Sequence, residues 1–137
     1  MSNEQLSPAR LNINTAADVV TARRKGLDMA TAIGFTLPEG TKIAVVVSEL
    51  ARNILLYAQT GTITLIPDTA GQPKSIKIIA QDKGPGIPDV DLVLKGGYTT
   101  SGGLGVGLSG SKRIMDKFEI QSVVGAGTMI TAVKQLR

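Results

Sequence analysis

The chain contains no cysteine, and this absence excludes both disulfide bonds and a metal site built on thiolate ligands. It also lacks an apolar run of the roughly 18 residues that a membrane-spanning helix requires. No basic segment precedes an apolar stretch, as it would in a secretory signal peptide. From these absences we expect a cytoplasmic protein with no membrane partner.

Aromatic residues make up only 3% of the 137 residues, so the core must be built from aliphatic side chains. Apolar residues make up 42%, which is enough for a single domain with one core. The net charge is +4, but the one basic triplet, residues 23–25, has no aromatic residue within nine positions. Because nucleic-acid binders usually combine basic residues with aromatic stacking, we expect no nucleic-acid partner.

The spacing of apolar residues predicts five strands and three main helices. The strands are expected at residues 10–14, 62–67, 75–82, 118–124 and 128–133, and the helices at residues 16–33, 41–58 and 108–117. The glycine-dense stretch from Lys83 to Gly107 is too long for an ordinary connection, so we expect a functional loop with a short helix inside it. Strands in adjacent pairs predict a single α+β domain of two layers. Its sheet would be mixed and mostly antiparallel, with the helices on one face.

Glu49 and Asn53 lie four residues apart on the second predicted helix and share a face that differs from its apolar stripe. A carboxylate can accept a proton, and an amide oxygen can ligate Mg²⁺, a hard ion that prefers oxygen. Taken alone, the pair fits an exposed polar face of an amphipathic helix better than a catalytic site. The catalytic interpretation therefore depends on the motifs that follow.

The segment from Asp82 to Ile87, Asp-Lys-Gly-Pro-Gly-Ile, directly follows a predicted strand. An aspartate at the end of a strand can accept a hydrogen bond from an exocyclic amine such as that of adenine. Its two glycines let the backbone turn and come close to a flat ring. The same residue types form ordinary turns, so a plain turn has equal weight at this point.

A glycine-rich segment leads into the third predicted helix. Its closely spaced glycines leave backbone N–H groups free to face an anion, and the helix N-terminus adds partial positive charge. The spacing also matches a dinucleotide-binding fingerprint, but no predicted strand precedes it, as that motif requires. We therefore interpret it as a phosphate cradle, formed by Thr100, Ser101, Gly102, Gly103, Leu104, Gly105, Val106 and Gly107.

Together and in this order, the three motifs resemble the N, G1 and G2 boxes of the GHKL superfamily of ATPases and kinases, which share the Bergerat fold. The resemblance covers nearly the whole chain and is closer to the stressosome switch kinases, relatives of the anti-sigma-factor kinases. It is carried by residues 48–54, 82–89 and 100–105, with support from residues 112–116 and 125–128. Histidine-kinase relatives phosphorylate a histidine, which this chain lacks, so it cannot autophosphorylate on histidine.

The resemblance implies a role for each matching residue. Glu49 would be the general base of a serine/threonine protein kinase, Asn53 would ligate Mg²⁺, and residues 100–107 would form a lid over the phosphates. The remaining nucleotide-binding residues would be Asp82, Gly84, Gly86, Ile87 and Thr128. Among these, Asp82 would bind the adenine amine, and Thr128 would support it. ATP and Mg²⁺ are therefore the expected cofactors.

Members of this family phosphorylate a serine or threonine of STAS-domain scaffold proteins, then leave the scaffold and activate a PP2C-type phosphatase. The resemblance implies the same partners for this chain. The main alternative is a module that uses ATP only to shape a protein-binding surface, such as an anti-sigma factor. Glu49 favours the kinase, because pure binding does not need a carboxylate one helical turn from the Mg²⁺ ligand.

Overall fold

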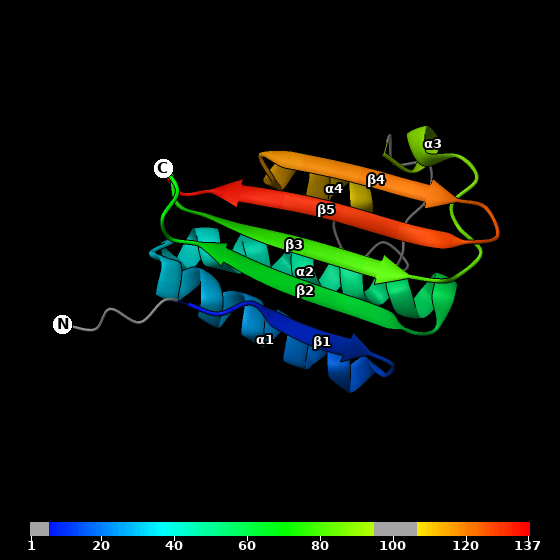
Figure 1. Cartoon of the computed structure of the whole chain (residues 1–137), viewed down its shortest axis with the longest axis horizontal. Coiled ribbons are helices and arrows are strands. Elements are labelled where there is room, and N and C mark those ends of the chain that lie inside the picture. Colours follow the sequence, from blue (N-terminus) through cyan, green and yellow to red (C-terminus); the bar gives the residue numbers. More distant parts are fainter. Residues whose placement is uncertain (1–5, 95–106) are drawn as a thin grey trace.

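A computed structural model describes residues 6–94 and 107–137 of the chain (Figure 1). The elements in chain order are β1 (Ala9–Ile13), α1 (Ala16–Ile33), α2 (Leu37–Ala58), β2 (Gly61–Asp68), β3 (Ser75–Asp82), α3 (Val90–Leu94), α4 (Gly107–Ile114), β4 (Lys117–Val123) and β5 (Gly127–Gln135). The short helix α3 confirms the prediction of a helix between residues 83 and 107. Among the described residues, no helix is long and apolar enough to cross a membrane.

The strands form one sheet in the order β1-β2-β3-β5-β4, and α1, α2 and α4 lie on one of its faces (Figure 1). This arrangement confirms the predicted two-layer α+β fold. Every neighbouring pair of described strands is antiparallel, so the expected mixed sheet is wrong in this detail. The reason is the position of β5. Strands β3 and β4 run in the same direction, but β5 lies between them, so they do not form a parallel pair.

The start of α1 is fixed by a capping box. The Asp18 backbone N–H donates to Thr15 Oγ1 at 3.3 Å, and Asp18 Oδ2 accepts from the Thr15 N–H at 3.0 Å. The helix ends at Gly34, where φ is +123° and the N–H donates to the carbonyls of Ala30 and Thr31. Local side-chain chemistry therefore sets both ends of this helix.

Helix α2 begins at Leu37, four residues before the predicted start at residue 41. Thr36 caps it, because its Oγ1 accepts a hydrogen bond from the Glu39 N–H at 3.3 Å, and Pro38 fits the first turn. The helix packs on the sheet and against α1. Its buried residues are Gly40, Ile43, Ala44, Val46, Val47, Ser48, Glu49, Leu50, Ala51, Asn53 and Ile54.

Several boundaries differ from the prediction for tertiary reasons. Strand β2 continues through Pro67 to Asp68, and its pairing with β1 ends at Leu65. Proline has no N–H to donate, so it is tolerated where one side of the strand is unpaired. Helix α4 ends at Ile114, not at residue 117, because the Asp116 N–H donates to the Val133 carbonyl at 2.9 Å and starts sheet pairing.

The capping carboxylate of Asp18 makes a prediction about acid stability. The backbone N–H of Asn14 chiefly, together with Thr15, holds the pKa of Asp18 below its ordinary value. A lowered pKa stabilises the fold above about pH 3.9, the ordinary aspartate value, and this contribution is lost as the pH falls through the lowered pKa. Asp18→Asn should therefore reduce the difference in unfolding free energy between pH 7 and pH 3.

The measurement is urea unfolding of both proteins at the two pH values. Asp28→Asn, at an acidic position in the middle of α1, is the matched control and should keep the wild-type difference between pH 7 and pH 3. An unchanged difference in Asp18→Asn would contradict the assignment of the cap.

Candidate functional site

Glu49 and Asn53 are both buried, with side chains only 1% and 3% exposed. The alternative of an exposed polar face is therefore wrong for this pair. The physical reason is that α2 is covered on two sides, by the sheet and α1 and also by α4. A polar pair at such a position must be satisfied by the protein or by a ligand, because burying an unpaired polar group is costly.

The two carboxylate oxygens of Glu49 accept hydrogen bonds from different elements. Oε2 accepts from Arg52 Nη1 at 2.7 Å, and Oε1 accepts from the backbone N–H of Gly107, the first residue of α4, at 3.1 Å. Arg52 is 41% exposed, so its guanidinium connects the buried carboxylate with solvent. Both contacts offset the desolvation of the carboxylate, and the partial positive charge at the start of α4 adds to them.

The side-chain oxygen Oδ1 of Asn53 has no hydrogen-bond partner within the described part of the chain, although it is buried. Native proteins rarely leave a buried acceptor unsatisfied, and an exception calls for an explanation such as a bound ion. An amide oxygen is a suitable ligand for Mg²⁺, which keeps several waters and substrate oxygens in its shell. The orphaned oxygen of Asn53 therefore fits the cation that the motif predicted.

Asp82 ends β3 and lies directly opposite Thr128 of β5 in the sheet register. Asp82 Oδ1 accepts a hydrogen bond from the Gly84 N–H at 2.8 Å, which tightens the turn after the strand. The Thr128 hydroxyl lies 2.9 Å from Ser122 Oγ, and Ser122 Oγ accepts from the Ile87 N–H at 2.6 Å. The structure thus brings together Asp82, Thr128 and Ile87, and Ser122 joins the last two.

The turn at residues 83–87 is packed too closely for side chains at its glycines. A Cβ atom on Gly84 would lie 2.6 Å from the Cβ of Ala58 at the end of α2. Gly86 has a φ of +84°, and a Cβ there would lie 2.6 Å from the Val123 carbonyl oxygen. The two glycines let this turn pack between the last turn of α2 and the hairpin of β4 and β5.

The predicted phosphate cradle is described only at its last residue. Thr100, Ser101, Gly102, Gly103, Leu104, Gly105 and Val106 lie outside the described residues. Gly107 is buried, has a φ of +68° and opens α4 with its N–H on Glu49. The sequence predicts a phosphate contact for Gly107, whereas in the structure its backbone N–H donates to the carboxylate of Glu49, the candidate base.

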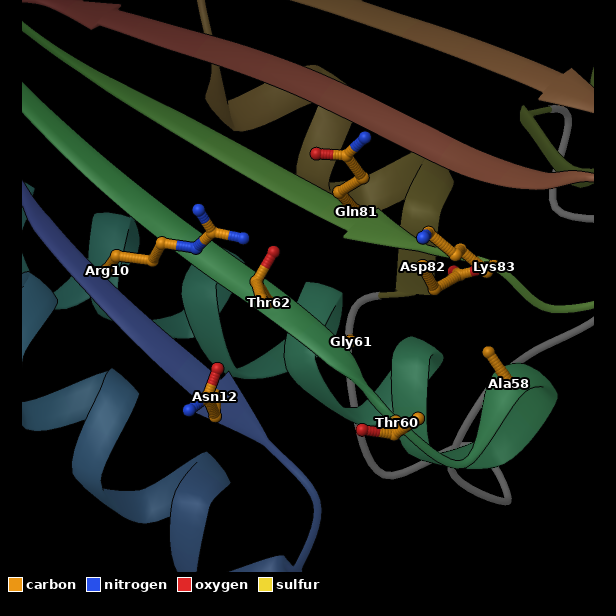
Figure 2. Close-up of a pocket in the computed structure, with 9 residues that line it drawn as sticks. All are labelled: Arg10, Asn12, Ala58, Thr60, Gly61, Thr62, Gln81, Asp82 and Lys83. Atoms are coloured by element: carbon orange, nitrogen blue, oxygen red, sulfur yellow. The ribbon is translucent and has the colours of Figure 1, made fainter.

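A separate cavity of about 340 Å³ opens where β2 begins and β3 ends (Figure 2). Arg10, Thr62 and Gln81 project from the sheet face opposite the helices to line it, and Asp82 lies at its rim. Neither Glu49 nor Asn53 lines this cavity. The cavity is therefore distinct from the site around Glu49 and Asn53 on the helix side of the sheet. The two sites come together only at Asp82, where β3 ends.

Two residues of the site were missed by reasoning from sequence. Arg52 follows Glu49 by three residues on a helix, a spacing at which opposite charges meet, so this signal was present. Ser122 gives no such signal, because Thr128 reaches it through the pairing of β4 with β5, and Ile87 reaches it from the loop after β3. Local pairs could be found from sequence, and cross-strand networks could not.

Comparison with known proteins agrees with this geometry. Residues 39–137 match the model of the family described as histidine kinase-, DNA gyrase B- and HSP90-like ATPases. A solved Mycobacterium tuberculosis protein containing RsbU and RsbW domains superposes with a TM-score of 0.66 at 15% identity. That superposition covers 96% of this chain and 33% of the other, so this chain spans about a third of the solved one. At such low identity the likeness supports the fold alone.

The chain is 48% identical over 127 residues to the serine/threonine-protein kinase RsbT of Bacillus subtilis, covering 93% of this chain and 96% of that protein. It is also 28% identical over 107 residues to an anti-sigma F factor of a Thermoanaerobacter species, covering 74% of this chain and 73% of that factor. The chain therefore belongs to the histidine kinase-, DNA gyrase B- and HSP90-like ATPases, and within that family to the serine/threonine-protein kinases of the RsbT type.

Proposed function

We propose that this kinase transfers the γ-phosphoryl group of Mg-ATP to a serine or threonine hydroxyl of a STAS-domain protein, with Glu49 as the general base. The observation that carries the proposal is the buried pair on α2. An orphaned amide oxygen lies one helical turn from a buried carboxylate that is held by two donors. This arrangement supplies a cation ligand and a proton acceptor side by side.

The nucleotide would be held between α2, β3 and the turn after β3. Asp82 accepts a hydrogen bond from the adenine amine, and Thr128 lies across the sheet from it. Asn53 holds the Mg²⁺ ion, which when bound neutralises charge on the phosphates. Gly84 and Gly86 let the turn pack against Ala58 and Val123, and this packing fixes the backbone that would border the adenine. We assign residues 100–106 to the phosphates, as their sequence predicts, and Gly107 to the Glu49 carboxylate, which accepts its N–H.

In the transfer step, the acceptor hydroxyl oxygen forms a bond to the γ-phosphorus while the bond between that phosphorus and the leaving ADP oxygen breaks. The hydroxyl proton passes to the carboxylate of Glu49. Within the described residues, the carboxylate accepts hydrogen bonds from Arg52 and from Gly107. These two donors fix the orientation of the carboxylate, which favours in-line transfer.

Partner switching would follow from the added charge. A phosphorylated serine or threonine carries about −1.5 to −2 charges, which adds repulsion and desolvation cost at an interface. We propose that the phosphorylated STAS-domain protein then dissociates, and that the released kinase binds and activates a PP2C-type phosphatase. The relationship to the serine/threonine-protein kinase RsbT, at 48% identity, supports the phosphotransfer with which this order of events begins.

The second candidate function is an ATP-dependent protein-binding module without phosphotransfer. The relationship to anti-sigma F factors, at 28% identity, is the observation that favours it. The two functions differ in the need for Glu49. A kinase requires its carboxylate for transfer, whereas a binding module needs only a nucleotide-loaded surface.

Asp82→Asn should weaken ATP binding. The amide presents both a donor and an acceptor where the carboxylate only accepts, and losing a charge-assisted hydrogen bond costs roughly 1.5–3 kcal/mol, or about 10- to 150-fold in Kd. Isothermal titration calorimetry measures this change. The matched control is Asp68→Asn, because Asp68 Oδ1 accepts from the Gly71 N–H at 2.8 Å in a similar turn at the other end of the sheet. Equal ATP affinity in Asp82→Asn and Asp68→Asn would remove Asp82 from the adenine site.

Asn53→Ala should reduce the benefit that Mg²⁺ gives to ATP binding, because the variant lacks the orphaned side-chain oxygen. Titrations of ATP with Mg²⁺ and with EDTA measure that benefit directly. Asn53→Asp is the matched variant, since it keeps a ligating oxygen at the same place. If Asn53→Ala binds ATP with the same Mg²⁺ dependence as the wild type, the ion is held elsewhere.

Glu49→Gln should bind ATP normally but transfer phosphate on the order of 100-fold more slowly, because general-base catalysis contributes about that factor. The assay uses labelled ATP and STAS-domain proteins encoded near the kinase, with mass spectrometry to locate the modified residue. Glu119→Gln, at an exposed position of β4, is a control for a loss of carboxylate outside the nucleotide site. Nucleotide-dependent binding of a STAS protein without label on any partner would establish the binding module instead.

A further inference from the structure

Helix α4 connects the candidate base with the far end of the domain. It has eight residues and is about 12 Å long at a rise of 1.5 Å per residue. At its first residue, the Gly107 N–H donates to Glu49. Its packing partners among the helices are α2 and α3. A displacement of its far end would therefore be passed along the helix to the amide that contacts the carboxylate.

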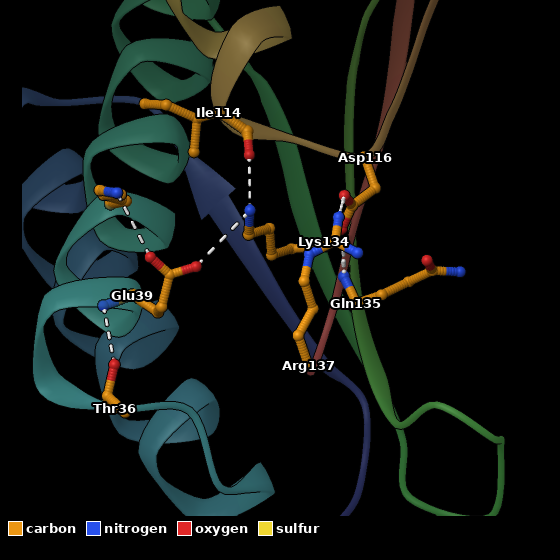
Figure 3. Close-up of polar contacts among 8 residues, drawn as sticks. Thr36, Glu39, Ile114, Asp116, Lys134, Gln135 and Arg137 are labelled. Atoms are coloured by element: carbon orange, nitrogen blue, oxygen red, sulfur yellow. Dashed lines mark hydrogen bonds and ion pairs between the residues drawn. The ribbon is translucent and has the colours of Figure 1, made fainter.

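The far end of α4 is held by Lys134 of β5, as Figure 3 shows. The Lys134 ammonium donates to the carbonyl oxygen of Ile114, the last residue of α4, at 2.9 Å. The same ammonium lies 3.6 Å from Glu39 Oε1 in the first turn of α2. One cation therefore joins α4, β5 and α2, and its side chain is only 12% exposed.

The neighbouring turn is tied to the same strand. Asp116 follows α4, and its Oδ2 accepts a hydrogen bond from the Gln135 N–H at 2.7 Å while its Oδ1 accepts from Arg137. Lys42 approaches the other carboxylate oxygen of Glu39 at 3.3 Å, and it is 58% exposed. The Lys42 ammonium chiefly, together with Lys134, holds the pKa of Glu39 below its ordinary value, so Glu39 stays charged at neutral pH.

We propose that Lys134 is a positioning residue for the catalytic carboxylate, and that it acts through α4. The inference rests on the proposed role of Glu49 as general base. A cation at the C-terminus of a helix is favoured by the helix dipole and satisfies a terminal carbonyl. With Ile114 held at one end, Gly107 is held at the other, and the Glu49 carboxylate keeps its orientation.

The experiment compares Lys134→Met with the wild-type protein in two measurements. Methionine keeps most of the length of the side chain and removes the ammonium, so the Ile114 carbonyl and Glu39 both lose their partner on β5. The first measurement is hydrogen exchange of the Gly107 amide by NMR, which should become about 10-fold faster as local opening becomes easier. The second is phosphotransfer, in which kcat should fall by about 10-fold, since small misplacements near a reacting group are costly.

The KM for ATP should change less than kcat in Lys134→Met, because the proposed ligands of the ion and of the adenine, Asn53 and Asp82, lie on α2 and β3 rather than on α4. Lys42→Met is the matched control. It also removes one ammonium from Glu39, but it does not touch α4, so the Gly107 exchange rate and kcat should both remain at wild-type values. Lys134→Arg restores a cation and should recover most of the lost kcat.

Three results would overturn the proposal. One is wild-type exchange at Gly107 in Lys134→Met, and another is faster exchange with an unchanged kcat. The third is an equal fall of kcat in Lys42→Met, which would show a general effect of the Glu39 ion pairs. If the wild-type protein transfers no phosphate to any partner, the proposed function fails instead, and the exchange rate of Gly107 still tests whether Lys134 holds α4.

Discussion

Burial of the Glu49 carboxylate is the constraint on which the arrangement of the helix layer depends. Removing a carboxylate from water costs several kcal/mol even after a protein relaxes around it. Here that cost is offset by a guanidinium on the same helix and by the first amide of α4. The guanidinium is supplied by local sequence, but the amide is present only when α4 is in place. The hydrogen bonds of the Glu49 carboxylate are therefore complete only when α4 has packed against α2.

Helix α2 contacts both the apolar core and the buried polar site. One side packs aliphatic residues such as Ile43 and Leu50 into the core, while another carries the buried polar pair Glu49 and Asn53. Its last turn also limits the loop after β3, because Ala58 leaves no space for a side chain on Gly84. Because α2 makes contacts on several sides, it cannot shift without affecting the core, the proposed base and the turn after β3 together.

Much of the fold could be predicted because its signals are local. Apolar periodicity located all five strands, and the Thr15 cap and Gly34 fixed the ends of α1. The early start of α2 was also signalled, by Thr36 and Pro38, but the periodicity before residue 41 is weak and hid it. The burial of Glu49 could not be predicted, since the amide that covers it belongs to a residue 58 positions later in the chain. The same holds for the row formed by Asp82, Thr128 and Ser122, which exists only once three strands have paired.

The strand order has a consequence for how the domain is assembled during synthesis. Strand β5 is the last described strand along the chain, yet it lies between β3 and β4. Until β5 emerges, β4 has no neighbour, β3 is an open edge, and Asp82 lacks Thr128 opposite it. Unpaired strand edges in incomplete chains promote aggregation. The segment up to Asp82 can form its helices and the β1-β2-β3 sheet early, but the pairing of Asp82 with Thr128 at the proposed adenine site forms only in a late step.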